Sequence, residues 1–172
     1  GEWLISKSPY VAGGQRFRQF EISIDNSGQN TLTEPFWIMS GVSDNLNSTM
    51  YKVRSDSIFS GNWYFIVITK SDNNLRLYVN GIQEVDSIIN DSFYLNTSDF
   101  LIGQYWGYGF NTIPTTTRDF TGTIDDVGMW NRVLTDCEIQ NLYSGSLSNC
   151  EQGTSSDTTV CLGDTISLGT SV

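Results

Sequence analysis

Histidine is absent from the 172-residue sequence, and lysine and arginine together number 9 against 19 aspartates and glutamates. Without histidine the chain has no serine–histidine–aspartate triad and no histidine-ligated zinc site. The formal net charge of −10 repels phosphate backbones and anionic membranes, so we do not expect nucleic acid as a partner. An acidic surface of this kind suits a secreted protein, or one that binds neutral sugars or cations.

Long apolar runs are also absent, and none approaches the roughly 20 residues that a membrane-spanning helix needs. A chain of 172 residues suits one domain with at most a fragment of a second. Glycine, serine, threonine, asparagine and aspartate separate short aromatic and β-branched runs, which is typical of an all-β protein.

Apolar and polar residues alternate with a period of two in several short segments. In FEISID, residues 20–25, the apolar side chains share one face and Glu21, Ser23 and Asp25 share the other. Further predicted strands cover residues 35–42, 50–55, 62–70, 75–81, 99–104 and 120–130. About eight or nine short strands with turns between them indicate a two-sheet antiparallel sandwich or a jelly roll.

The segment from residue 62 to residue 81 predicts a hairpin, because a short SDNN connection joins two apolar strands. Its second strand is expected to turn Leu75, Leu77 and Val79 inward. Asn80-Gly81 is a tight-turn signal that leads into a further short strand, IQEV. Trp63 and Trp130 also lie in strand patterns, and we expect them to pack in the core or at the rim.

One short helix is predicted near residue 140. Thr135 followed by Glu138 forms a capping box, in which the hydroxyl and the carboxylate bind each other's backbone amides. A single apolar stripe follows and a glycine then ends the helix; these residues are Ile139, Leu142, Tyr143 and Gly145.

The three cysteines are Cys137, Cys150 and Cys161. An odd number suggests one local bridge and one thiol whose partner lies elsewhere. Cys137 and Cys150 enclose a short segment, and a bridge between them would stabilise the fold by about 3 kcal/mol. The alternative is that all three thiols are free.

The composition changes after residue 147 and predicts the domain organisation. Residues 1–147 form the sandwich domain, and the polar, apolar-poor residues 148–159 are a predicted linker. Residues 160–172 resume β alternation and are too short to fold alone. We therefore expect them to be the first strand of a following β domain in a multi-domain protein.

Three stretches carry a resemblance to a known family: GNWYFIVITKSDNNLRLYVNG at 61–81, LIGQ at 101–104, and FTGTIDDVGMWNRVLTDCEIQNLY at 120–143. In this order they resemble the laminin G-like and pentraxin-like domains of the concanavalin A-like lectin/glucanase superfamily. The resemblance runs from about Trp3 to Tyr143 and implies a jelly roll of two curved antiparallel sheets. The family begins with further strands ahead of residue 3, which are not recognised in this sequence.

The same superfamily includes carbohydrate-binding modules, adhesion domains and, more distantly, glycoside hydrolases, so the fold alone selects no function. Its glycosidases carry glutamate, aspartate and glutamate at alternate positions of one strand, since two carboxylates must flank the scissile bond. No E-x-D-x-E pattern occurs here; the glutamates stand apart at 2, 21, 34, 84, 138 and 151. We therefore do not expect an enzyme.

Calcium is the metal that acidic loops of this kind favour, because it binds carboxylate, amide and carbonyl oxygens. Pentraxin-like relatives hold calcium just after the GQ element, where this chain instead reads Tyr105-Trp106-Gly107. The remaining candidates are Asp119, Asp125 and Asp126, and Asp44, Asn45 and Asn47 in a second loop. Adjacent strand residues point to opposite faces, so Asp125 and Asp126 share one site only across a bulge. The alternative, which we favour, is that Asp125 accepts backbone amides.

The loop after LIGQ is rich in aromatic residues and is loosened by glycines. Flat rings stack against the apolar faces of sugars, and nearby polar groups bind the hydroxyls. The candidate ligand-binding residues are Tyr105, Trp106, Tyr108, Phe110 and Arg118. The alternative is a loop that covers the sandwich edge or contacts the next domain.

Together these features predict a secreted or cell-surface module that binds a glycan or an extracellular protein without catalysis. Two alternatives remain open. One is a structural spacer in a multi-domain secreted protein, and the other is an accessory domain of a polysaccharide-degrading enzyme.

Overall fold

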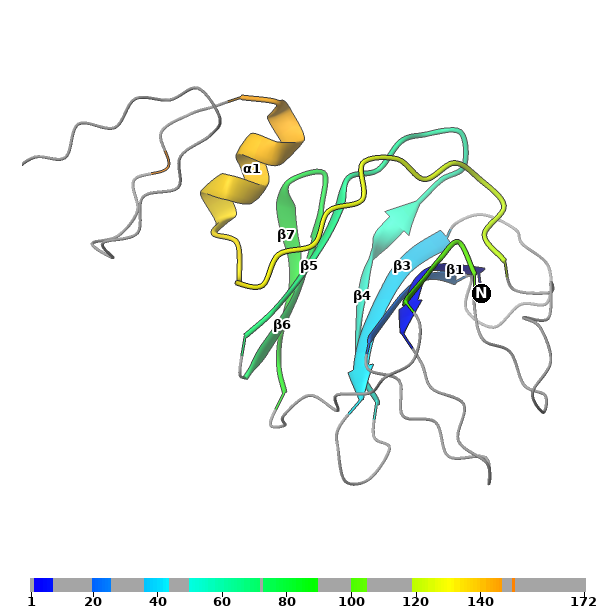
Figure 1. Ribbon diagram of the computed structural model, residues 1–172, viewed down its shortest axis with the longest axis horizontal. Coiled ribbons are helices and arrows are strands. Elements are labelled where there is room, and N and C mark those ends of the chain that lie inside the picture. The colour runs from blue at the N-terminus through cyan, green and yellow to red at the C-terminus, as the bar shows by residue number, and fades with distance from the viewer. Residues whose placement is uncertain are drawn as a thin grey trace, which may run out of the picture.

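A computed structural model describes residues 2–7, 20–25, 36–43, 50–71, 73–89, 100–104, 119–146 and 150. These residues form two antiparallel sheets and one helix, which Figure 1 shows as successive layers. The predicted two-sheet sandwich with one short C-terminal helix is confirmed. In the part of the chain that is described, no helix has the length and apolar character to cross a membrane.

The larger sheet has five strands in the order β4-β3-β2-β1-β8, and every neighbouring pair is antiparallel. Its strands are β1 (Glu2–Lys7), β2 (Phe20–Asp25), β3 (Phe36–Ser43), β4 (Met50–Ile58) and β8 (Phe100–Ile102). Strands β1 to β4 therefore follow one another in space as they do in sequence, whereas β8 returns to pair with β1.

The smaller sheet is the predicted hairpin extended by one strand. It contains β5 (Ile66–Lys70), β6 (Asn74–Val79) and β7 (Ile82–Ile88) in that order. At the β6–β7 turn Asn80 has φ 51° and Gly81 has φ 79°. Two left-handed residues in succession make the two-residue turn whose twist matches the strands, so the tight-turn signal at this dipeptide was correct.

The hydrophobic core lies between the two sheets. As predicted, Leu75, Leu77 and Val79 are buried, and they belong to one apolar cluster with Ile38 and Val53 of the larger sheet. Each such aliphatic side chain contributes about 1.5–3 kcal/mol when it is fully buried. The alternation in β6 thus fixes the face that this sheet turns to its partner.

Helix α1 (Asp136–Ser144) packs on the opposite face of the smaller sheet. Its Ile139 is fully buried in a second cluster with Val67, Tyr78 and Leu134. The capping box between Thr135 and Glu138 is present, and Gly145 ends the helix in the left-handed conformation, as predicted. The predicted apolar stripe is only partly buried, however; Leu142 and Tyr143 are about half exposed.

The disulfide prediction is confirmed, because Cys137 and Cys150 are bonded. The bridge ties the first turn of α1 to the chain that follows the helix. Cys161 lies outside the described residues, as do all of residues 151–172, so most of the predicted linker and the predicted following strand are not described. The division into domains therefore stays a prediction.

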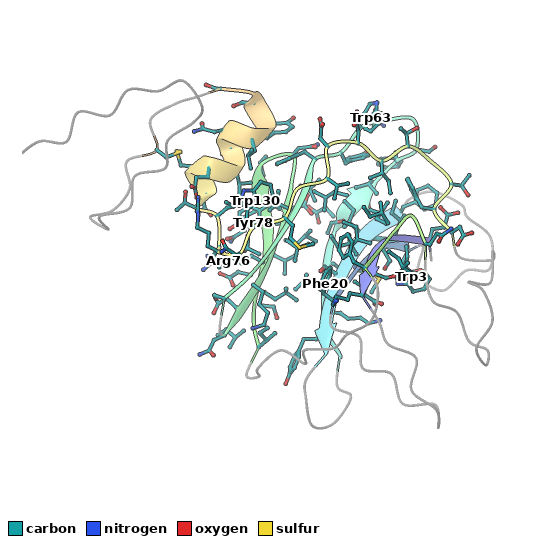
Figure 2. The ribbon with its side chains drawn as sticks, in the orientation of Figure 1. Trp3, Phe20, Trp63, Arg76, Tyr78 and Trp130 are labelled. Carbon is teal, nitrogen blue, oxygen red and sulfur yellow. A yellow bond between two sulfur atoms is a disulfide. The ribbon has the colours of Figure 1, made fainter. Side chains whose placement is uncertain are left out.

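Two strand predictions were wrong, one along its whole length and one at its start. Residues 120–130 contain no regular strand, because Asp126 adopts φ 49° and interrupts the extended backbone. Strand β5 begins only at Ile66, and Trp63 ahead of it is 69% exposed, at the upper rim in Figure 2. Trp63 is thus at the rim but largely uncovered, and it is not part of the core, while Trp130 is about half covered.

Candidate ligand site on the outer face of the larger sheet

The outer face of the five-stranded sheet, which is the face turned away from the core, carries buried polar side chains. Glu21 is 4% exposed and Ser23 is 5% exposed, although the sequence pattern placed both of them opposite the apolar face of β2. Ser6, directly opposite Glu21 on β1, is completely buried. A sheet face with buried hydroxyls and a buried carboxylate is polar and covered, and this is unusual for a surface that faces only solvent.

Trp3 supplies the aromatic part of this face. It lies opposite Ser23, it is 6% exposed, and its indole Nε1 donates a hydrogen bond to Oε2 of Glu21 across 3.1 Å. Figure 2 shows Trp3 on the side of the larger sheet that is away from the helix. A buried carboxylate is tolerated only where donors bind it, so this hydrogen bond helps to fix the Glu21 side chain in position.

The two ends of the predicted aromatic loop are attached beside this polar group. At the first end, Ser6 Oγ donates to the carbonyl of Gln104 at 3.0 Å. At the second end, Asp119 forms an isolated parallel bridge with Trp3, and the amide of Phe120 donates to the carbonyl of Gly103 at 2.9 Å. The chain between residues 104 and 119 therefore leaves and returns next to the outer face.

Asp119 adds a carboxylate whose bonding is incomplete. Its Oδ1 is buried and has no hydrogen-bond partner in the part of the chain that the structure describes. A buried acceptor without a donor costs about 1–3 kcal/mol of folding free energy. A ligand hydroxyl or amine that donated to Oδ1 would recover that free energy, so the atom is a candidate ligand contact.

Two rows of cross-strand neighbours extend the outer face toward the edge strand β4. One row runs through Ser6, Glu21, Gly41 and Lys52, and the other through Trp3, Ser23, Met39 and Arg54. Lys52 and Arg54 are exposed, in contrast to the buried residues of β1 and β2. Charge on this face thus changes from acidic at the β1–β2 pair to basic at β4.

The predicted ligand residues Tyr105, Trp106, Tyr108, Phe110 and Arg118 lie outside the described residues, so their roles stay predictions. The structure does place Gln104 and Asp119, the residues that precede and follow this segment.

The predicted metal ligands are spread along one segment. Asp125 and Asp126 are both exposed, and the amide of Asp126 donates to Oδ1 of Asp125 at 2.9 Å. Among the described residues, no three aspartate, glutamate, histidine or cysteine side chains gather into a group that could hold a metal ion. Asp44, Asn45 and Asn47 lie outside those residues. Calcium binding therefore stays a prediction.

Sequence reasoning missed Trp3, Ser6 and Glu21 as site residues. The alternation in FEISID gave the correct face for Glu21, but it carried no signal that this face would be covered. The contact between Trp3 and Glu21 joins residues 18 positions apart on neighbouring strands, and it depends on the register of β1 against β2.

The comparison with known protein families agrees with the fold. Residues 5–140 match the family model of the concanavalin A-like lectin/glucanase superfamily. A solved structure of an S-layer domain-containing protein (residues 221–444) from Clostridium thermocellum ATCC 27405 is similar, with 18% identity and a TM-score of 0.41. The match covers 80% of this chain and 63% of that one, and at this level it carries no argument about function. No curated protein matches the chain.

Proposed function

The chain belongs to the concanavalin A-like lectin/glucanase superfamily, and from this premise we propose that it is a non-catalytic module that binds a glycan on the outer face of its larger sheet. Among the predicted ligand residues, Tyr105, Trp106, Tyr108 and Phe110 supply rings for stacking. The carboxylate of Asp119 binds a sugar hydroxyl, while the buried hydrogen bond between Trp3 and Glu21 holds the adjoining strands in place.

One observation carries the proposal. The buried Oδ1 of Asp119 has no donor among the described residues, and it belongs to the residue that bridges Trp3, beside the Trp3–Glu21 hydrogen bond. Sugar hydroxyls are donors that such an acceptor binds well, and aromatic walls with a few polar groups are typical of ligand sites. Asp119 directly follows the predicted aromatic loop in the sequence, and this position supports a role in ligand binding rather than a purely structural one.

The absence of catalysis is part of the proposal. The strand motif of the superfamily's glycosidases does not occur in the sequence. Glycoside hydrolysis needs an acid and a second carboxylate on opposite sides of the bond that is cleaved. We therefore assign Asp119 to binding and Glu21 to holding the strands in place.

An extracellular location fits both the family and the covalent chemistry of the chain. The bond between Cys137 and Cys150 is of a kind that persists in oxidising compartments and is rare in reducing ones. We propose a secreted or cell-surface protein, in which this domain acts beside neighbouring β domains.

The test is a glycan array probed with the wild-type protein, with Asp119→Asn and with Trp106→Ala. We expect each substitution to weaken binding of the wild-type ligands by about tenfold or more, since each removes a direct contact. Glu84→Gln is the matched control, because Glu84 is an exposed carboxylate on β7 in the other sheet. The array is read with calcium and with a chelator, which tests the calcium prediction in the same experiment.

Three results would contradict the proposal. If the array shows no binding and calcium has no effect, the spacer alternative is favoured. If Asp119→Asn binds as tightly as the wild-type protein, a glycan site exists elsewhere on the domain. Release of reducing sugar from any bound polysaccharide would instead show that the domain is catalytic.

A further inference from the structure

Two exposed cations lie next to each other on the outer face of the larger sheet. Val53 of β4 is buried in the core, so Lys52 and Arg54 on either side of it point to the opposite, outer face. The pairing of Gly41 with Lys52 and of Met39 with Arg54 confirms that both residues share the face of Glu21 and Ser23. In a chain with only 9 basic residues, two of them occupy this one edge.

Neither cation pairs with an acidic side chain in the part of the chain that the structure describes. Arg76 with Asp86 and Arg132 with Glu138 are ion pairs between described residues, and both lie elsewhere in the fold. Lys52 and Arg54 form no ion pair within the described part of the chain, although acidic residues outnumber basic ones about two to one. Unpaired cations on an acidic protein are available to an anionic group of a ligand.

Arg54 is also held in position. Its guanidinium carbon lies 5.1 Å from the ring centroid of Trp37, which is within the range of a cation–π contact. A stacked guanidinium keeps its N–H groups directed outward in one plane, and this arrangement matches the two oxygens of a carboxylate. Lys52 lies two residues away and adds a second positive charge without fixed geometry.

The cations are close enough to the candidate site to contact the same ligand. Glu21 and Lys52 belong to one cross-strand row and are separated by a single strand, β3. Two strand spacings amount to about 10 Å. Glu21 itself is 4% exposed, so the ligand contact on that side of the face is Asp119, which bridges Trp3 at the start of the neighbouring row. Arg54 ends that row four strand spacings from Asp119, or about 19 Å, which is within the length of an oligosaccharide that lies across the strands.

We propose that the ligand of this face is an acidic glycan, and that Arg54 and Lys52 bind the carboxylates of its uronic acid residues. The inference rests on the proposed function and adds the chemical class of the sugar. A hydroxyl of the glycan donates to the carboxylate of Asp119, and the glycan carboxylates accept from the exposed Lys52 and Arg54. The net charge of −10 repels a polyanion elsewhere on the protein, which confines binding to this edge.

The experiment compares acidic oligosaccharides with their neutral methyl esters, which have the same sugar backbone. Oligogalacturonate, oligoalginate and hyaluronan oligosaccharides are titrated in their acid forms and as methyl esters, with calorimetry as the readout. We expect at least one acid form to bind about tenfold or more tightly than its ester, with an affinity that falls as salt is raised. Poly-L-glutamate, which has carboxylates but no sugar, is expected not to bind.

Variants then locate the contact. Arg54→Gln is expected to weaken binding of the acid form about tenfold and to leave the ester unaffected. Arg54→Lys keeps the charge but loses the planar fork, and it is expected to restore only part of the affinity. Lys70→Gln is the matched control, because it removes one positive charge from β5 in the other sheet. The thermal midpoint of each variant is measured to show that the fold is unchanged.

The outcomes separate this inference from the proposed function. Equal binding of acid and ester, an Arg54→Gln variant with unchanged affinity, or equal binding of poly-L-glutamate would overturn the acidic-glycan assignment. If neutral glycans bind and no acidic one does, the inference is wrong while the proposed function stands. If no glycan of either kind binds, both are wrong.

Discussion

The indole of Trp3 donates a hydrogen bond to the carboxylate of Glu21 across 3.1 Å, between neighbouring strands and on the face of the sheet that is opposite the core. This bond holds the Trp3 ring and the Glu21 carboxylate together as one buried pair. The pair lies next to Gln104 and Asp119, the residues at the two ends of the predicted ligand loop. It is therefore the point at which the stability of the sheet and the properties of the candidate site can be tested together.

Trp3→Phe is expected to destabilise the protein by about 1–3 kcal/mol, because it leaves the buried carboxylate of Glu21 with one donor fewer. The free energy of unfolding is measured by urea titration with fluorescence. Trp63→Phe serves as the control, since Trp63 is 69% exposed and its substitution is expected to change stability by no more than about 0.5 kcal/mol. Equal effects of the two substitutions would show that the hydrogen bond to Glu21 contributes little.

Acid is expected to weaken the N-terminus of α1. The Arg132 guanidinium donates to both carboxylate oxygens of Glu138, and with the amide and hydroxyl of Thr135 it lowers the pKa of Glu138 from 4.5 to about 2. Because the folded pKa lies below the unfolded one, this stabilisation is fully present above about pH 4.5 and is lost as the pH falls toward 2.

The Arg132 side chain is 45% exposed, so solvent screening reduces the contribution of this group to about 1 kcal/mol. The measurement is the pH dependence of the unfolding free energy for the wild-type protein and for Glu138→Gln. The difference between the two proteins is expected to be constant above about pH 4.5 and to shrink below it. A difference that is independent of pH down to 2 would contradict this assignment.

Reduction of the disulfide is expected to lower stability by about 3 kcal/mol, because the bridge between Cys137 and Cys150, which are 13 positions apart, closes a short loop in the unfolded chain. The comparison is between the oxidised protein and the double variant Cys137→Ser, Cys150→Ser, each unfolded in urea. Intact mass with and without reductant gives the number of bridges. Unchanged stability of the double variant would mean that the chain beyond α1 is ordered by other contacts.

Docking of the helix is expected to depend on one side chain. Ile139 is fully buried against Val67, Tyr78 and Leu134, and Ile139→Ala is expected to cost about 2–5 kcal/mol. Leu142→Ala is the matched control on the same helix, because Leu142 is about half exposed and loses much less contact. Differential scanning calorimetry gives both values, and similar losses would mean that the helix packs through a broader face than Ile139.

The sequence was a reliable guide wherever a structure depends on neighbours along the chain. The capping box needs only Thr135 and Glu138 three residues apart, and the turn at Asn80 and Gly81 needs only two residues that tolerate positive φ. Sequence reasoning failed in residues 120–130, where the alternation predicts a strand. The left-handed conformation of Asp126, with its amide bonded to Asp125, overrides that pattern.

The sequence by itself determined the two-sheet sandwich, the inward faces of β2 and β6 and the ends of α1, because each of these depends on periodicity or spacing along the chain. It left open whether Cys137 and Cys150 are bonded or free, and the structure shows the bond. Only the tertiary structure decided that Glu21 is buried, that Trp63 is exposed, and that Lys52 and Arg54 lie on the face of Trp3. Burial depends on what covers a face, and a row across a sheet depends on the register of strands that are far apart in sequence.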